Sequence, residues 1–239
     1  CGTSLPVTGC SAMSRAGFGG FAEYATPTES ALTAMPDSMS FVDAAALSHA
    51  GNLAVQALDL AGLTPGQSLL INGAGGGVGS LAVQLATHLG VQDIVGVDSA
   101  AKRDFLVDLG FARALDYREV DFTRMGEQFD VILDARSTRA PADYVRALAD
   151  GGHYVSVGGE TGRILGVALS KARILKRTGK TVELLMFKAN ADNARLLDLV
   201  AAGALSPRID STWPLEQTPE AMARFGRGEH LGKIVVTVD

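Results

Sequence analysis

The stretch Leu69-Leu-Ile-Asn-Gly-Ala-Gly-Gly-Gly-Val-Gly-Ser80 decides the fold of this 239-residue chain. Its first four residues form an apolar run that predicts a buried strand, and the glycines after it predict a tight turn. Leu81, Leu85 and Leu89 then recur along one face of a helix, and Gly90 follows as a helix-ending residue. The stretch therefore predicts a strand, a turn and a helix in direct succession.

The same alternation continues along the chain. Further strands are predicted at 94–97, 114–117, 129–134 and 154–157, with helices around 105–109 and 140–149. The helix around 140–149 is expected to stop at Gly151-Gly152. After Gly162 the pattern is weaker: 182–187 is a candidate sixth strand, 193–203 and 219–225 are candidate helices, and 234–238 is a candidate closing strand. Several strands are continuously apolar, which is typical of a parallel sheet covered on both faces, so we expect an α/β, doubly wound fold.

The glycine turn has the A-x-G-x-x-G form of a dinucleotide-binding fingerprint. Small residues permit the tight turn and a close approach of the backbone to a pyrophosphate, which the helix N-terminus also attracts. Asp98 lies 19 residues after Gly79, near the spacing of a ribose-binding acid. The alternative is an ordinary turn with Asp98 at a solvated strand end. The loop residues predicted to hold a cofactor are Ala74, Gly76, Gly77, Val78, Gly79 and Ser80.

Composition excludes several function classes. The net charge of -5 and the pI of about 5.4 argue against a nucleic-acid surface. No run of about 18 apolar residues predicts a membrane-spanning helix, and no signal peptide is visible. Two cysteines, Cys1 and Cys10, fit a reducing cytoplasmic setting better than a disulfide scaffold. Because residue 1 is not methionine and the first 20 residues show little periodicity, we expect a truncated or processed chain.

With these features in view, the run from Leu70 to Gln84 resembles the medium-chain dehydrogenase/reductase superfamily, in its zinc-free branch of quinone oxidoreductases and enone reductases. The supporting stretches, in the family's order, are Gly19-Gly-Phe-Ala-Glu-Tyr24, Ala44-Ala-Ala-Leu47 with Gln56-Ala-Leu58, Leu115-Asp-Tyr117 and Leu231-Gly-Lys-Ile-Val235.

The resemblance implies a Rossmann domain with remnants of a GroES-like catalytic domain at both ends. The remnant would be 1–25, the dinucleotide-binding domain 26–210 and the return segment 211–239. It also implies hydride transfer between NAD(P)H and a small quinone, enone or carbonyl compound. A homodimer joined through an edge strand near 182–187 is a further implication.

The residues disagree about which dinucleotide binds. Asp98 favours NADH because a carboxylate repels a 2′-phosphate, whereas Lys102 and Arg103 favour NADPH. The resemblance places Ser99, Lys102 and Tyr117 beside that phosphate, so we expect NADPH, with NADH possible because of Asp98. It also places Val157, Gly158 and Gly159 along the nicotinamide and makes His230 a polar cofactor contact.

The resemblance also brings Ser48, His49 and Asn52 near the nicotinamide as catalytic candidates, with His49 as a possible general acid. The alternative is that they only cap or line a helix start. Two departures from the family pattern stand nearby: Ser48 and Leu53 replace a frequent Pro and Thr, and Asp134-Ala-Arg-Ser-Thr138 replaces D-x-V-G-G.

Two rival functions stay open. Most of the family's amino-terminal catalytic domain is absent, so the chain could bind cofactor without catalysis, as a binding or structural module. His49 lies near a zinc ligand of zinc-dependent alcohol dehydrogenases, but a catalytic zinc needs about three protein ligands, so we expect no metal. Cys10 has only Arg15 as a nearby cation in sequence and is expected to be inert.

Overall fold

The computed structural model describes residues 6–10 and 20–238. The chain forms two compact units. Residues 53–187 make one of them, which we call the sheet unit, and residues 1–52 with 188–239 make the other, the terminal unit. The sheet unit is narrower at both ends than the predicted domain 26–210. Of the predicted remnant 1–25, residues 1–5 and 11–19 lie outside the described residues, including Cys1 and Gly19.

Six parallel strands form the sheet unit's centre, in the order β5-β4-β3-β6-β7-β8. This order confirms the predicted doubly wound parallel sheet, because the chain adds strands outward from β3 in both directions. The predicted sixth strand is β8, at one edge. The strands are β3 Ser68–Asn72, β4 Asp93–Asp98, β5 Arg113–Asp116, β6 Phe129–Asp134, β7 Leu148–Ser156 and β8 Thr181–Leu184.

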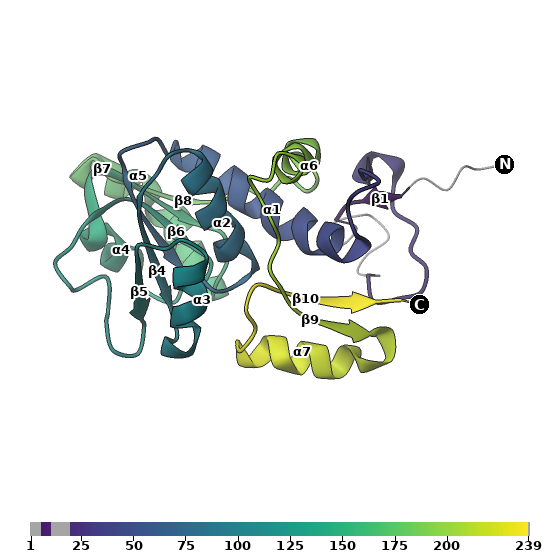
Figure 1. The fold of residues 1–239 in the computed structure, drawn as a ribbon. Coiled ribbons are helices and arrows are strands. Elements are labelled where there is room, and N and C mark those ends of the chain that lie inside the picture. The colour runs from purple at the N-terminus through teal and green to yellow at the C-terminus, as the bar shows by residue number, and fades with distance from the viewer. Residues whose placement is uncertain (1–5, 11–19, 239) are drawn as a thin grey trace. The chain divides into compact units, whose positions relative to one another are not determined.

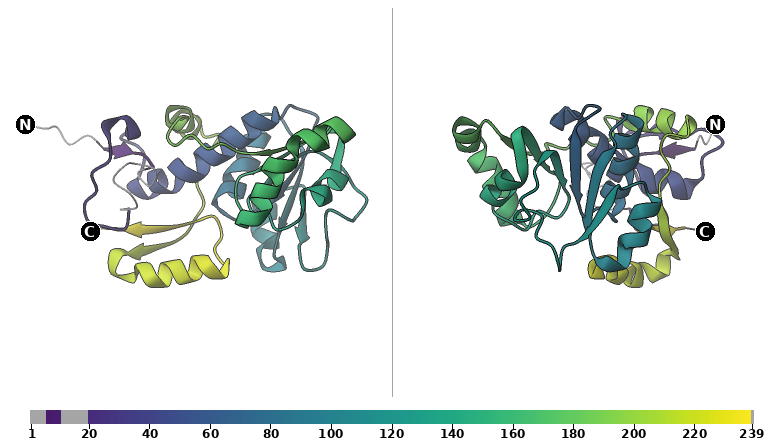
Figure 2. Two further views of the ribbon diagram at one scale, coloured as in Figure 1. Left: turned by 180° about the vertical axis from the view of Figure 1, so that it is seen from behind. Right: turned by 60° about the vertical axis from the view of Figure 1, so that its left-hand side comes forward.

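Helices cover both faces of this sheet. α2 (Gly77–His88), the 3-10 turn η2 (Ala100–Lys102) and α3 (Arg103–Asp108) connect β3, β4 and β5. α4 (Pro141–Ala147) and α5 (Thr161–Thr178) connect β6, β7 and β8. Right-handed crossovers that move in opposite directions place the two sets of helices on opposite faces, as the front and rear views show (Figures 1 and 2).

The core explains why the strands are apolar throughout. Leu70, Val95, Ile132 and Tyr154 from four neighbouring strands are fully buried. A strand that is covered on both faces has no solvent side and therefore does not alternate between apolar and polar residues.

In the second half of the sheet unit one expectation was wrong and one helix was not expected at all. The helix predicted at 140–149 ends at Ala147, and Gly151-Gly152 lies inside β7, where the pairing jumps from Phe129–Leu148 to Val131–His153. A Cβ at Gly152 would meet the carbonyl oxygen of Ala149 at 2.9 Å, so glycine permits this bulge. The sequence also gave no sign of α5, because Val167 is the only residue that this helix buries fully.

The terminal unit combines segments from both ends of the chain. β1 (Val7–Thr8) pairs antiparallel with β2 (Thr33–Ala34), which follows the 3-10 turn η1 (Glu29–Ala31). α1 (Phe41–Ala61) begins in this unit, and α6 (Asn193–Ala201) belongs to it. β9 (Ile209–Pro214) and β10 (Lys233–Thr237) pair in parallel, joined through η3 (Leu215–Gln217) and α7 (Thr218–Arg227) (Figure 1). No described helix has the length and apolar character needed to cross a membrane.

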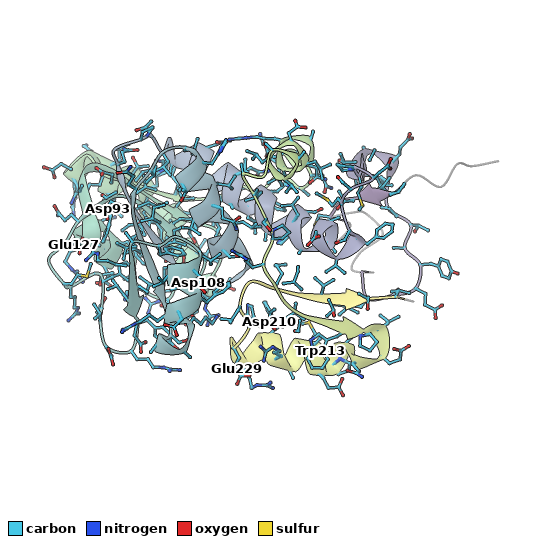
Figure 3. All side chains as sticks on the ribbon, viewed as in Figure 1. Asp93, Asp108, Glu127, Asp210, Trp213 and Glu229 are labelled. Carbon is cyan, nitrogen blue, oxygen red and sulfur yellow. The ribbon has the colours of Figure 1, made fainter. Side chains whose placement is uncertain are left out.

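Asp210 holds the β9–α7–β10 segment together. Its two carboxylate oxygens accept hydrogen bonds from Nε and Nη2 of Arg224, each at 2.7 Å, and Oδ1 also accepts one from the Leu231 amide at 3.0 Å. Asp210 lies at the start of β9 (Figure 3). Its side chain is only 3% exposed. The Arg224 guanidinium lowers the pKa of Asp210 to about 2, and the Leu231 N–H and Ser211 hydroxyl add to that effect.

This contact predicts an acid-sensitive contribution to stability. A depressed carboxyl pKa stabilises the fold above the unfolded value of 3.8, and that contribution is lost as the pH falls toward about 2. Asp210→Asn should therefore lose less unfolding free energy than the native chain between about pH 6 and pH 3, by roughly 1–2 kcal/mol. Urea unfolding at both pH values measures this difference. Asp198→Asn, at an exposed site on α6, is the matched control, and an equal effect from it would contradict the assignment.

Candidate functional site

The sheet has one place where a ligand is expected on topological grounds. β3 and β6 are neighbours, but their following connections leave toward opposite faces. In open α/β sheets, ligands bind in the crevice at the carboxyl ends of such a strand pair. Asn72 ends β3 and Asp134 ends β6, and Asn72 Nδ2 donates a hydrogen bond to Asp134 Oδ1 at 2.8 Å. The glycine loop begins directly after Asn72.

The glycine loop divides into packing and exposed positions. A Cβ at Gly79 would lie 2.4 Å from the Ala74 carbonyl oxygen and 2.6 Å from that of Gly73, so only glycine lets α2 pack this closely on the turn. Ala74 and Ser80 are likewise buried. Gly76, Gly77 and Val78 reach the surface, and Gly76 precedes the helix without a side-chain cap. The N–H groups of the first turn can therefore face an anion.

Asp98 and Lys102, which the sequence set against each other, form an ion pair in the fold. Lys102 Nζ lies 3.4 Å from Asp98 Oδ1, and the lysine is only 5% exposed. Asp98 also accepts hydrogen bonds from the amides of Gly75 and Ser99, both at 2.9 Å. The carboxylate thus ties the glycine loop to the end of β4, and Lys102 offsets its negative charge.

Tyr117 lies beside the same strand ends. Its amide donates to the Asp98 carbonyl oxygen at 3.1 Å, while its ring is exposed. The Arg118 guanidinium lies 5.3 Å from the centre of that ring, a cation–π distance. Sequence reasoning missed Arg118, although its position next to Tyr117 was a usable signal.

The segment predicted to lie along a nicotinamide is locked to the loop after β6. The Val157 amide donates to the Asp134 carbonyl oxygen at 2.9 Å, and the Ser137 amide donates to that of Gly158 at 3.0 Å. Gly159 has a φ of 145°, and a Cβ there would lie 2.5 Å from the Ser137 nitrogen. The two loops therefore hold one another in place.

A buried polar network supports these loops from below. The Tyr154 hydroxyl donates to Asp134 Oδ2 at 2.8 Å, and Ser137 Oγ lies 2.8 Å from both the Tyr154 hydroxyl and Ser156 Oγ. The Tyr144 ring stacks on that of Tyr154 at 4.2 Å. Burial raises the pKa of Asp134 and that of Tyr154, so the tyrosine stays a neutral donor. Sequence reasoning found Asp134 only as a departure from a motif.

Two of the catalytic candidates are buried inside α1, not at a helix start. Asn52 Nδ2 donates to the Ser48 carbonyl oxygen at 2.6 Å and to Asn193 Oδ1 at 2.7 Å, and Asn52 Oδ1 accepts from the Asp192 amide at 2.8 Å. Ser48 Oγ lies 2.6 Å from the hydroxyl of Thr8. These contacts join α1 to β1 and to the start of α6.

The catalytic candidate His49 and the predicted cofactor contact His230 also belong to the terminal unit. The remaining predicted cofactor residues belong to the sheet unit. His49 is exposed, and its pKa is lowered by partial burial of the ring and by the charge of Lys233. His230 is buried, with its ring 5.0 Å from that of Phe225.

The described residues do not fit a zinc site. Within 6–10 and 20–238, no group of three or more His, Cys, Asp or Glu side chains could hold a metal ion. Cys10 is a ligand-type neighbour of His49, with Sγ 3.6 Å from Nδ1. His153 instead pairs with Glu183 at 2.7 Å. A catalytic zinc takes about three protein ligands, so we derive no step through zinc.

Comparison with known proteins identifies a family. A family model described as zinc-binding dehydrogenase matches residues 109–236. The chain is 30% identical over 227 residues to a 2-methylene-furan-3-one reductase of Solanum lycopersicum, covering 92% of this chain and 53% of that protein. It is 27% identical over 227 residues to the NADPH-dependent alkenal/one oxidoreductase, chloroplastic, of Arabidopsis thaliana, with the same two coverages, 92% and 53%.

A solved structure agrees with the fold. The quinone oxidoreductase from Coxiella burnetii superposes with a TM-score of 0.78 at 26% identity, covering 89% of this chain and 66% of that one. The chain spans about half the length of the two reductases named above.

The packed position Gly79 and the more open position Gly76 predict different outcomes when each is replaced by alanine. Gly79→Ala should lower the unfolding free energy by about 3 kcal/mol or more, because its Cβ meets backbone that cannot move. Gly76→Ala should change stability by less than about 1 kcal/mol, since its nearest neighbour is the Gly73 oxygen at 3.4 Å. Its Cβ should still weaken dinucleotide binding. Urea unfolding and NADPH titration check both, and equal stability losses would contradict this division.

The buried network predicts a measurable cost for one hydroxyl. Tyr154→Phe leaves Asp134 and Ser137 with fewer partners in the core and should destabilise the chain by about 1–3 kcal/mol. Thermal and urea unfolding measure the change. Tyr24→Phe, at a site 88% exposed, is the matched control and should unfold like the native chain. A neutral result for Tyr154→Phe would show that water replaces the lost contacts.

Proposed function

This chain belongs to the zinc-binding dehydrogenase family of the medium-chain dehydrogenase/reductase superfamily, and on that premise we propose that it is an NADPH-dependent reductase of small conjugated carbonyl compounds. The glycine loop at the switch point of the sheet carries the proposal. Its small residues and its helix N-terminus, which has no side-chain cap, suit the pyrophosphate of a dinucleotide.

The chain's own residues would bind and orient the cofactor. A bound nicotinamide supplies a hydride to the acceptor. The amides of Gly77 and Val78, in the first turn of α2, would bind the pyrophosphate. The interlocked loops 135–138 and 157–160, held by Asp134 and Tyr154, would orient the nicotinamide ring and keep it from shifting.

The environment of Asp98 supports NADPH over NADH. Its carboxylate is engaged by two amides and by Lys102, so it repels a 2′-phosphate less than a free carboxylate would. Ser99, Tyr117 and Arg118 lie near the same strand ends and offer donors and a cation. One relative's name specifies NADPH. NADH is the alternative if the cofactor displaces Lys102 and the ribose hydroxyls take its place.

The names of the relatives support the substrate class. They specify a methylene-furanone, an alkenal or enone, and a quinone, which all contain a double bond conjugated with a carbonyl group. We propose His49 as the residue that hydrogen-bonds the acceptor through an N–H of its neutral ring, because the ring reaches solvent. Ser48 and Asn52, which are buried in α1, are proposed as positioning residues.

A second copy of the chain is the proposed partner. β8 is an edge strand of the sheet, and Leu169 and Met186 near it are each 77% exposed. Pairing between two such edges would cover these side chains. Light scattering that shows a monomer would overturn this proposal.

Cofactor preference tests the proposed nucleotide site. Titration of NADPH and NADH, followed by their own fluorescence, should show tighter binding of NADPH by about tenfold. Arg118→Ala should weaken NADPH binding and leave NADH binding unchanged. Lys102→Met should shift the preference toward NADH, because it removes the cation that offsets the Asp98 carboxylate and leaves that carboxylate to repel the 2′-phosphate. Arg124→Ala, also exposed, is the matched control. Tighter binding of NADH in the native chain would reverse the cofactor assignment.

Turnover separates the proposed enzyme from its rivals. Oxidation of NADPH in the presence of a simple enone or a benzoquinone should be faster with the chain than without it. NADPH binding without turnover of any acceptor would instead support a cofactor-binding module. Activity toward an alcohol that appears only after zinc is added would support a zinc-dependent alcohol dehydrogenase.

A further inference from the structure

Cys10 directly follows Thr8 and Gly9, and both of these residues are held by contacts within the terminal unit. The Thr8 hydroxyl bonds the Ala44 carbonyl oxygen at 3.2 Å and lies 2.6 Å from Ser48 Oγ, which fixes this residue on α1. A Cβ at Gly9 would lie 1.9 Å from the Ala31 carbonyl oxygen, so only glycine fits there. Thr8 and Gly9 therefore fix the position of the backbone that leads into Cys10.

Asn190 holds the backbone of Cys10 from the other side. Its Oδ1 accepts from the Cys10 amide at 2.6 Å, and its Nδ2 donates to the Cys10 carbonyl oxygen at 3.2 Å. Asn190 has a φ of 63°, a left-handed conformation that is uncommon for a residue other than glycine. Asn193 Nδ2, from the start of α6, reaches the same Oδ1 at 3.3 Å. Such local strain persists where the surroundings hold it, and it often marks functional sites.

The Cys10 side chain meets an imidazole. Its Sγ lies 3.6 Å from Nδ1 of His49, on α1. Partial burial of the ring and the charge of Lys233 lower the pKa of His49, so the neutral ring prevails near neutral pH. With its proton on Nε2, that ring presents Nδ1 as an acceptor for the thiol proton.

A lysine adds positive charge to the same cluster. Lys233, at the start of β10, interacts electrostatically with both Cys10 and His49. Burial lowers the pKa of Lys233, and the charge of a Cys10 thiolate opposes that shift. A base in contact with a thiol can take up its proton as the sulfur attacks an electrophile. The fold adds Lys233 to the surroundings of Cys10, for which the sequence pointed only to Arg15 as a nearby cation.

We propose that Cys10 is the nucleophile of a thiol-modification site that takes soft carbon electrophiles, above all α,β-unsaturated carbonyl compounds. His49 accepts the thiol proton, and the sulfur forms a bond to the β-carbon of the acceptor. The electron pair of the carbon–carbon double bond moves to the α-carbon, which takes the proton back from His49. The product is a thioether, and no oxidant or reductant is consumed.

Every residue in this site belongs to the terminal unit, and His49 is shared with the proposed reductase site. Its reaction needs neither NADPH nor hydride transfer, so it can be tested without either. If the proposed reductase activity also holds, the same class of compound is both substrate and covalent modifier of the chain.

The test measures the rate at which N-ethylmaleimide modifies Cys10. A Cys1→Ser background leaves Cys10 as the single cysteine, and intact mass follows the adduct near pH 7 without dinucleotide. We expect the folded chain to react at least about tenfold faster than the same chain unfolded in urea. His49→Gln and Lys233→Met should each slow the folded chain several-fold, and Cys10→Ser should give no adduct.

Matched controls separate chemistry from packing. His88→Gln and Lys176→Met remove the same groups at exposed sites on α2 and α5 and should keep the native rate. Circular dichroism checks that each variant is folded, and His49→Gln, at an exposed position, keeps the test available if Lys233→Met does not fold. A folded chain that reacts no faster than the unfolded one, or no slower after His49→Gln, would overturn the proposal.

Discussion

The sheet unit depends on one close approach, that of α2 to the turn after β3. Because Gly79 has no side chain, α2 packs against the backbone of Gly73 and Ala74 and begins within a few residues of the strand. That packing brings the Gly75 amide onto the Asp98 carboxylate, which ties the glycine loop to the neighbouring strand. A helix displaced by even one methyl group would lose this contact, and the first-turn amides would no longer face the crevice.

Polar side chains at strand ends perform a second task, which is to fix loops without closing the crevice. Asp134 is buried, yet Asn72, Tyr154 and the Arg136 amide all donate to it, so the cost of its burial is offset by hydrogen bonds. The loops after β6 and β7 are consequently held by bonds made beneath them. Residues 157–160 nevertheless stay half-buried or exposed, and a loop that is both fixed and exposed suits a rigid binding site.

In the terminal unit, polar side chains also form buried hydrogen bonds, but there they join helices and strands to one another. The side chains of Asn52 and Ser48 form hydrogen bonds that join α1 to α6 and to β1. Asn190 and Gly9 fix the chain around Cys10. Next to this framework His49 is exposed and Cys10 is half-buried, and the proposed chemistry of the unit lies on these two side chains.

Local patterns in the sequence determined the strand–turn–helix at the glycine loop, the alternation of strands and helices, and the parallel sheet, because burial on two faces leaves continuous apolar runs. The loop residues and Asp98 followed from the glycine motif and its spacing, whereas Ser99 and Tyr117 followed from the family resemblance. Only the tertiary structure decided the bulge in β7, the helix α5, the ion pair of Asp98 with Lys102, and the meeting of Cys10 with His49 and Lys233. Periodicity reports how a segment is buried, but it carries no information about which distant segment buries it.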